Sequence, residues 1–169
     1  IYLFIFVSVL IHSLFINISI NEHMDGSDGN GSWDGLIDDG SWVDNKKRIL
    51  KLIDCDDFYG MKLGDLHAWF ASKRKNYDNV VVVPVHLYGY PNNIQRIRDL
   101  CNVYATYIIE DCSQAHGTMI RLGKVGNFGE LGVFSCYAGK NLGAIGEAAI
   151  ITTNHNDLNL TLKELRNLG

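Results

Sequence analysis

From about residue 46 onward, the hydrophobic positions alternate between continuous apolar runs and runs spaced by three or four residues. Residues 80–85 read Val-Val-Val-Val-Pro-Val, which is typical of a strand buried on both faces. Leu63, Leu66, Trp69 and Phe70 instead recur at the spacing of one helix face. Taken together, these patterns predict strands over 48–55, 80–85, 106–111, 131–136 and 147–153, and helices over 63–73, 94–104 and 158–168.

This alternation of strands and helices predicts an α/β fold with a mostly parallel sheet flanked by helices. In such sheets, ligands bind beyond the carboxyl ends of the strands. Asp111 and Ser135 stand at the ends of two predicted strands. We therefore expect both residues to lie at the edge of the sheet where a ligand binds.

The first 45 residues follow a different pattern. Ile1 to Ile20 carry no formal charge and are mostly Ile, Leu, Phe and Val, as in a membrane span or the apolar part of a secretory signal. A buried element and a segment outside the mature protein are the alternatives. Met24 to Asp44 are rich in Gly, Asp and Ser, which indicates a flexible linker. We therefore divide the chain into residues 1–45 and a domain over 46–169.

Composition and charge exclude several classes of protein. The chain of 169 residues is 47% hydrophobic and 20% charged with a net charge of −4, so it is neither disordered nor collagen-like. No basic surface for nucleic acid is expected. The four cysteines include no Cys-x-x-Cys pair, so we predict no metal site, reduced thiols and a cytoplasmic protein. The first residue, Ile1, and the helix-like ending at Gly169 suggest a fragment.

Several short motifs occur in one order along the second part of the chain. They are Pro-Val-His-Leu-Tyr-Gly (84–89), Ile-Glu-Asp-Cys-Ser-Gln-Ala-His-Gly (109–117), Phe-Ser-Cys-Tyr-Ala-Gly-Lys-Asn-Leu-Gly (134–143) and Leu-Arg-Asn-Leu-Gly (165–169). Together they resemble the DegT–StrS family of sugar aminotransferases, which depend on pyridoxal 5'-phosphate (PLP). The resemblance covers about residues 50–169. It implies part of the large PLP-binding domain of the aspartate-aminotransferase fold type, without the small C-terminal domain.

Lys140 is the candidate catalytic residue. It lies between Gly139 and Gly143, and a loop of small residues lets a bulky ligand approach the backbone. An amine there can form a Schiff base with an aldehyde cofactor, and the resemblance implies this role. The alternative is a surface lysine at a turn.

The resemblance also implies three further cofactor-binding residues. Asp111 would pair with the pyridine nitrogen, Gln114 would contact the cofactor ring or its phenolic oxygen, and Ser135 would bind the phosphate. Each residue also has a structural alternative: a helix cap for Asp111, a solvent-facing amide for Gln114 and a buried strand serine for Ser135.

His116, Tyr137 and Asn141 are further candidates for the pocket. For His116, a structural histidine is at least as good an explanation. Cys112 lies near His116 in sequence, so a thiol nucleophile is conceivable, but a small buried thiol explains Cys112 better.

The resemblance implies transfer of an amino group, from a donor such as glutamate, to a nucleotide-linked keto-deoxysugar by a homodimeric enzyme of amino sugar and polysaccharide biosynthesis. Two alternatives remain open. One is an inactive, truncated remnant of such an enzyme, and the other is a membrane-tethered, non-enzymatic α/β protein that rests on residues 1–20 alone.

Overall fold

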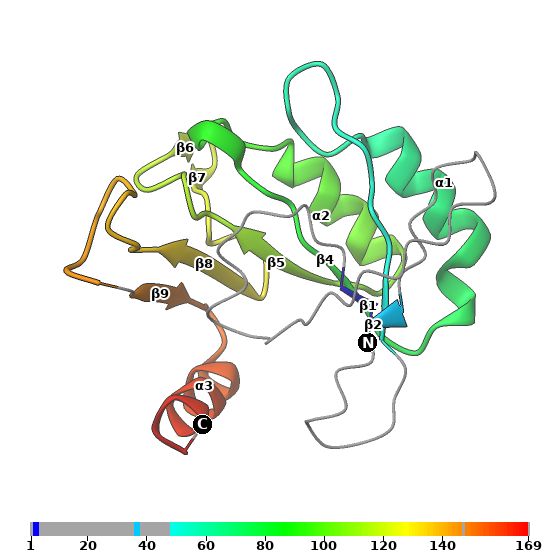
Figure 1. Cartoon of the computed structure of the whole chain (residues 1–169). Coiled ribbons are helices and arrows are strands. Elements are labelled where there is room, and N and C mark those ends of the chain that lie inside the picture. Colours follow the sequence, from blue (N-terminus) through cyan, green and yellow to red (C-terminus); the bar gives the residue numbers. More distant parts are fainter. Residues whose placement is uncertain (1, 4–35, 38–47, 147, 169) are drawn as a thin grey trace.

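The computed structural model describes residues 2–3, 36–37, 48–146 and 148–168 (Figure 1). Their strands form a seven-stranded sheet in the order β2-β3-β1-β4-β5-β8-β9. The strands are β1 (Tyr2–Leu3), β2 (Leu36–Ile37), β3 (Arg48–Leu50), β4 (Val80–Val82), β5 (Tyr107–Asp111), β8 (Leu131–Ser135) and β9 (Ala149–Thr152). The helices are α1 (Leu63–Lys73), α2 (Ile94–Val103) and α3 (Asn156–Leu168), with short 3-10 turns η2 (Arg74–Asn76) and η3 (Leu87–Gly89).

The predicted fold class is confirmed. Strands β3, β1, β4, β5 and β8 run parallel to one another, and their carboxyl ends therefore meet at one edge of the sheet. The two outer strands, β2 and β9, run antiparallel to their neighbours. The sheet is thus mostly parallel, as the alternation of strands and helices predicted.

The helices predicted over 63–73 and 94–104 form within one residue of their predicted bounds. The strand predicted over 48–55 ends earlier, at Leu50. Farther along the predicted strand, the Asp54 carboxylate accepts a hydrogen bond from the backbone N–H of Cys55, and the Asp56 carboxylate accepts one from the N–H of Gly60 in the turn that follows. Short polar side chains that bind nearby backbone compete with a strand in this way.

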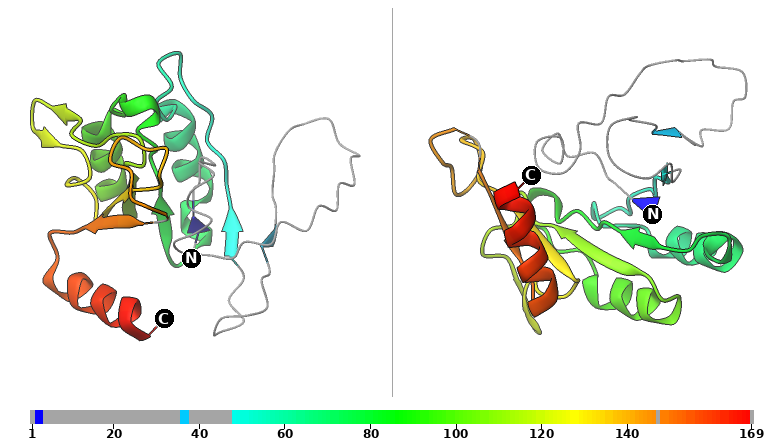
Figure 2. Two further views of the ribbon diagram at one scale, coloured as in Figure 1. Left: turned by 60° about the vertical axis from the view of Figure 1, so that its left-hand side comes forward. Right: turned by 90° about the horizontal axis from the view of Figure 1, so that it is seen from below.

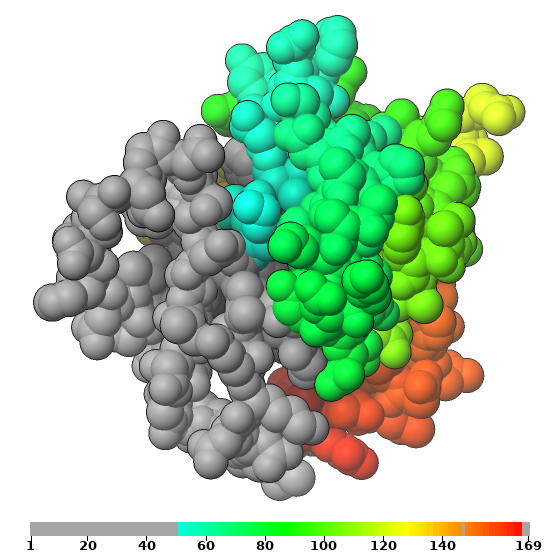
Figure 3. Space-filling view, turned by 90° about the vertical axis from the view of Figure 1, so that its right-hand side faces the viewer, coloured from blue at the N-terminus to red at the C-terminus, as the bar shows by residue number. Residues whose placement is uncertain are grey.

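An antiparallel hairpin of β6 (Met119–Ile120) and β7 (Gly123–Lys124) has no counterpart in the predicted elements. Two residues in each strand are too few to produce a recognisable hydrophobic period. The hairpin stands out from the surface at the upper right of Figure 3.

Helices α1 and α2 lie together on one face of the sheet (Figures 1 and 2). Their apolar sides and the strand residues beneath them form the main hydrophobic core. The buried residues are Ile53, Leu66, Phe70, Val80, Val82, Ile94, Ile97, Cys101 and Ile108. Helix α3 lies apart from this pair, next to the outer strand β9.

Within the described residues, no helix combines the length and apolar character that crossing a membrane requires. The predicted apolar segment, 1–20, falls outside the described residues except for Tyr2 and Leu3. The division into 1–45 and 46–169 stays a prediction, because most of the first part is likewise outside them.

A buried and an exposed position of α2 allow a direct test of this core. We expect Ile97→Ala to lower the free energy of unfolding by about 2–5 kcal/mol, because the substitution opens a cavity in a packed core. Val103→Ala on the same helix is the matched control, because Val103 is 78% exposed, and it should change the free energy by less than about 0.5 kcal/mol. Urea titration measures both values. Equal losses would show that α2 does not pack as described.

Candidate active site

The carboxyl ends of β5 and β8 lie side by side and bring two predicted site residues to one face of the sheet. Asp111 pairs with Val133, and the backbone N–H of Cys112 donates to the carbonyl of Val133 at 2.8 Å. Since side chains alternate along a strand, Asp111, Val133 and Ser135 share the face opposite α1 and α2. Asp111 and Ser135 are each 2% exposed. The two residues therefore lie at the same carboxyl-end edge of the sheet, as predicted, and a ligand-binding role for that edge stays a prediction.

The Asp111 carboxylate has one oxygen bound and one oxygen unpaired. Its Oδ1 accepts a hydrogen bond from the backbone N–H of Ser113 at 2.9 Å. Its Oδ2 is buried and has no hydrogen-bond partner among the described residues. Turns rather than a helix follow over 112–118, so Asp111 caps no helix. A buried carboxylate oxygen without a donor is unfavourable, which suits a site where a ligand supplies an N–H.

Gln114 lies in the turn after β5, and its side chain is held by the backbone of η3, the 3-10 turn that follows β4. Its Oε1 accepts a hydrogen bond from the backbone N–H of Tyr88 at 2.8 Å. Tyr88 adopts the left-handed backbone conformation, with φ of +56°, which is uncommon for a bulky residue. Since Oε1 is engaged by the backbone, the donor end of the amide, Nε2, is the end that is available to a ligand.

Lys140 lies half-buried in a turn over 138–142 that follows β8. The backbone N–H of Lys140 donates to the carbonyl of Tyr137 at 2.8 Å, and the N–H of Tyr137 donates to Ser135 Oγ at 3.2 Å. The loop is closed by a bond from the N–H of Ala144 to the carbonyl of Cys136 at 2.8 Å. These bonds tie the lysine turn to the end of β8, beside Asp111.

The loop carrying Lys140 also depends on a close backbone approach. A Cβ at Gly143 would lie 2.5 Å from the carbonyl oxygen of Ala138. Any side chain at that position would therefore push the two ends of the turn apart. The small residues around Lys140, from which we inferred room for a ligand, also serve to fold the loop on itself.

The three further pocket candidates lie in different surroundings. The His116 ring packs against Phe134, with centroids 5.5 Å apart, and Phe134 points to the sheet face opposite Ser135. Both ring nitrogens of His116 are buried and without a hydrogen-bond partner among the described residues. Tyr137 and Asn141 are exposed beside Lys140. A pocket role for these three residues stays a prediction.

Sequence reasoning missed a buried polar cluster directly behind Asp111. His86 and Glu110 are completely buried, and His86 Nε2 lies 3.1 Å from Glu110 Oε2. Glu110 also accepts backbone N–H bonds from Gly126, Phe128 and Gly129 at 2.7–2.9 Å. The available signal was a glutamate in an otherwise apolar strand, next to a candidate site residue.

Burial and hydrogen bonding act in opposite directions on Glu110. Burial alone would raise the pKa of its carboxyl, but the bonds from His86 and from three backbone N–H groups outweigh burial and lower the pKa below its ordinary value of 4.5. Glu110 is thus ionised within the core. His86 Nδ1 accepts from the backbone N–H of Asn92 at 3.0 Å, so the imidazole is neutral and carries its proton on Nε2.

Cys112 completes this cluster but is chemically inert. Ligand atoms of His86, Glu110 and Cys112 lie within 4.8 Å of one another. However, burial, together with the charges of Glu110 and Asp111, raises the pKa of the Cys112 thiol well above its ordinary value, and a neutral thiol is neither a nucleophile nor a good metal ligand. Both Glu110 oxygens are already saturated by N–H donors. The thiol is therefore a buried packing group.

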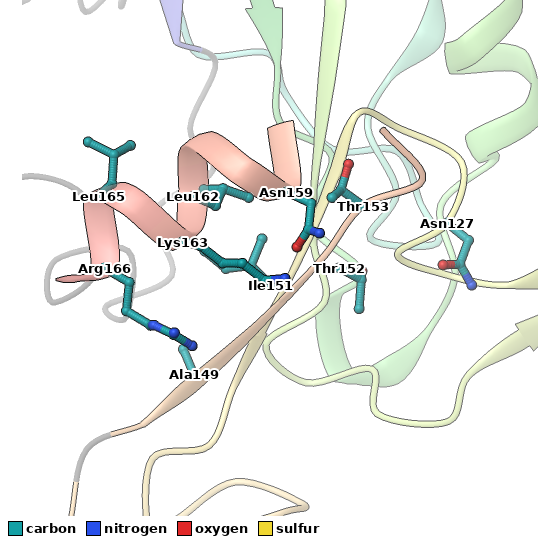
Figure 4. Close-up of a pocket in the computed structure, with 10 residues that line it drawn as sticks. All are labelled: Asn127, Ala149, Ile151, Thr152, Thr153, Asn159, Leu162, Lys163, Leu165 and Arg166. Atoms are coloured by element: carbon teal, nitrogen blue, oxygen red, sulfur yellow. The ribbon is translucent and has the colours of Figure 1, made fainter. Parts of the chain in front are cut away.

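A separate groove of about 700 Å³ lies between β9 and α3 (Figure 4). It is lined by apolar residues such as Ile151 and Leu162, with Lys163 and Arg166 at its side. None of the predicted site residues lines this groove. It is therefore distinct from the site at the ends of β5 and β8.

Comparison with known proteins assigns the class. Residues 62–169 match the model of the DegT/DnrJ/EryC1/StrS aminotransferase family, and the chain belongs to this family. The chain is also similar to a solved aminotransferase of this family from Brucella abortus, with a TM-score of 0.60 and 28% identity over 68% of this chain and 32% of that one. It is likewise similar to the solved sugar aminotransferase CalS13 from Micromonospora echinospora, with a TM-score of 0.59 and 29% identity over 71% of this chain and 33% of that one.

Among curated proteins, the chain is 38% identical over 118 residues to UDP-N-acetyl-3-dehydro-alpha-D-glucosamine 3-aminotransferase of Acidithiobacillus ferrooxidans, covering 69% of this chain and 31% of the relative. It is 39% identical over 88 residues to dTDP-3-amino-3,4,6-trideoxy-alpha-D-glucose transaminase of Streptomyces venezuelae, covering 52% and 23%. The chain thus spans less than a third of the length of these relatives.

Glu110 predicts a specific acid response. Because its pKa is lower in the folded than in the unfolded chain, it contributes stability above about pH 4.5 that is lost as the pH falls through the lowered folded value. Glu110→Gln removes this proton uptake. The free energy of unfolding of the variant should therefore fall less steeply than that of the wild-type chain between about pH 6 and pH 3. Urea midpoints across this range measure the slopes. Glu164→Gln, an exposed change of the same charge, is the control, and a Glu110→Gln slope equal to the wild-type slope would contradict the assignment.

The thiols predict a second pattern. In the folded protein, iodoacetamide at about pH 8 should modify the half-buried Cys55 and spare Cys112, which is buried and protonated. Peptide mass spectrometry locates the label. In urea both thiols should react, which controls for peptide recovery. Rapid labelling of Cys112 in the folded protein would show that the cluster behind Asp111 is open.

Proposed function

We propose that this chain carries the lysine side of a PLP site of a nucleotide-sugar aminotransferase. The observation that supports this most directly is the buried Oδ2 of Asp111, which lies at the end of β5 on the same sheet face as Ser135 and finds no hydrogen-bond partner among the described residues. Such an oxygen fits a protonated pyridine nitrogen, which is a strong hydrogen-bond donor. The residues present therefore fit the cofactor that the family implies.

Each site residue has a distinct task in this proposal. Asp111 binds the ring nitrogen and keeps it protonated. Ser135 donates its hydroxyl to the cofactor phosphate, and Gln114 offers Nε2 to the ring or its oxygen. His116, Tyr137 and Asn141 contribute to the pocket wall.

Lys140 is the reacting group of the chain. Its primary amine would hold the cofactor by condensing with an aldehyde carbon, with loss of one water. Once free again, the same amine would carry a proton to or from the substrate carbon. When bound, PLP supplies an electron-withdrawing ring that stabilises negative charge on that carbon. The hydrogen bonds between the lysine turn and β8 hold the backbone of Lys140 close to the end of the strand that pairs with β5.

The names of the relatives support a proposal for the substrate class. Their names specify amino sugars linked to UDP and to dTDP, and a further relative, 38% identical over 98 residues, is GDP-perosamine synthase of Vibrio cholerae. We infer a nucleotide-linked keto-deoxysugar as acceptor, an amino donor such as glutamate, and a homodimer as the working state. Residues 46–169 are then the partial PLP-binding domain, which the match over 62–169 supports.

Cofactor capture tests the proposal. The chain is incubated with PLP and reduced with borohydride, and the modified lysine is located by peptide mass. We expect the label on Lys140, at least about tenfold above that on other lysines, because a site with bound partners raises the local concentration of the reacting groups.

Two variants control this experiment. Lys140→Ala should abolish the selective label, and Lys124→Ala, on the exposed hairpin, should leave it unchanged. Scattered labelling that neither variant alters would overturn the proposal and favour an inactive copy of the enzyme.

A further inference from the structure

Glu110 is a buried charge for which the proposed chemistry has no use. It precedes Asp111 on β5 and points to the opposite face of the sheet. Its two oxygens accept four hydrogen bonds, from His86 Nε2 and from the backbone N–H groups of Gly126, Phe128 and Gly129. These donors come from the exit of β4 and from the segment that leads into β8. One carboxylate thus joins the strands on both sides of β5.

The network closes on Asp111. The His86 ring is held between Glu110 and the backbone N–H of Asn92. The backbone N–H of His86 donates to the carbonyl of Asp111 at 2.9 Å, and the N–H of Asp111 donates to the carbonyl of Pro84 at 2.9 Å. The regular strand β4 ends at Val82, so these bonds extend the pairing of β5 to its last residue. Hydrogen bonds thus connect the Glu110 side chain, through His86, to the backbone of Asp111.

The network requires a carboxylate rather than an amide. Four N–H donors converge on the two oxygens, and each oxygen accepts two of them. An amide at the same place offers only one oxygen, and its NH2 group would face two N–H donors with no acceptor between them. A neutral glutamine therefore disturbs this cluster while keeping the size of the side chain.

We propose that Glu110 is a positioning residue for the proposed PLP site: through His86 it fixes the backbone of Asp111, so that Oδ1 stays bound to Ser113 and Oδ2 stays buried and free for the cofactor's ring nitrogen. The part of this inference that concerns the cofactor rests on the proposed function. The part that concerns Asp111 does not, and the two can be measured separately.

Glu110→Gln in the full 169-residue chain is the test variant. Glu130→Gln is its matched control. The Glu130 carboxylate also accepts a backbone N–H bond, that of Ile108 at 2.5 Å, but Ile108 lies near the start of β5 and Asp111 at its end. Both variants lose one charge. Glu110→Gln also leaves two of the four converging N–H donors without an acceptor, whereas Glu130 is not among the partners of Glu110 and His86.

The first readout needs no cofactor. Amide hydrogen exchange at Ser113 reports the bond to Asp111 Oδ1. After correction for global stability by urea titration, we expect Glu110→Gln to speed this exchange by about tenfold or more, and Glu130→Gln to leave it unchanged. Equal exchange in the two variants would overturn the proposal.

The second readout uses PLP labelled with 15N in its ring. The chemical shift of that nitrogen distinguishes the protonated from the unprotonated ring. We expect the protonated signal in the wild-type chain and in Glu130→Gln, and a loss of that signal in Glu110→Gln. An unchanged signal in Glu110→Gln would overturn the role toward the cofactor. A wild-type chain that does not capture PLP on Lys140 would contradict the proposed function, while exchange at Ser113 still decides whether Glu110 positions Asp111.

His86→Ala covers the case in which Glu110→Gln does not fold. It leaves Glu110 its three backbone donors and removes the bond to the segment after β4, together with the acceptor of the Asn92 N–H. Faster exchange at Ser113 in this variant supports the proposal. His86→Gln, which restores a donor for Glu110, should return the exchange rate toward the wild-type value, and no such rescue would count against the path through His86.

Discussion

A buried carboxylate needs hydrogen-bond donors from the protein, and Glu110 finds four of them in two separate segments, His86 after β4 and residues 126–129 before β8. This requirement fixes how the exit of β4, the strand β5 and the approach to β8 meet. Since the ends of β5 and β8 carry Asp111 and Ser135, the arrangement of the candidate site depends on a charge that lies behind it.

The side chains on the two faces of β5 have different roles. Ile108 and Glu110 face α1 and α2, where one joins the apolar core and the other anchors the neighbouring segments. Asp111 faces the other way, and its Oδ2 has no hydrogen-bond partner in the part of the chain that the structure describes. The period of two along a strand therefore places a structural carboxylate and a candidate cofactor-binding carboxylate next to each other in sequence but on opposite sides of the sheet.

The names of three relatives specify sugars linked to UDP, dTDP and GDP. The match to the family model over residues 62–169 includes Asp111, Ser135 and Lys140. The groove between β9 and α3 contains none of the candidate site residues.

The sequence alone determined the α/β class, the helices over 63–73 and 94–104 and the strand-end positions of Asp111 and Ser135, because apolar periodicity is a local property. The motifs around Asp111 and Lys140 also sufficed to identify the family. Tertiary structure decided what depends on distant partners: the antiparallel course of β9, the hairpin of β6 and β7, and above all the ring formed by Glu110, His86 and Asp111. Glu110 lies 24 residues from His86 and 16–19 from its backbone donors. No local pattern reveals that bonds over such separations will converge on one carboxylate, since only the packing of parallel strands brings those donors together.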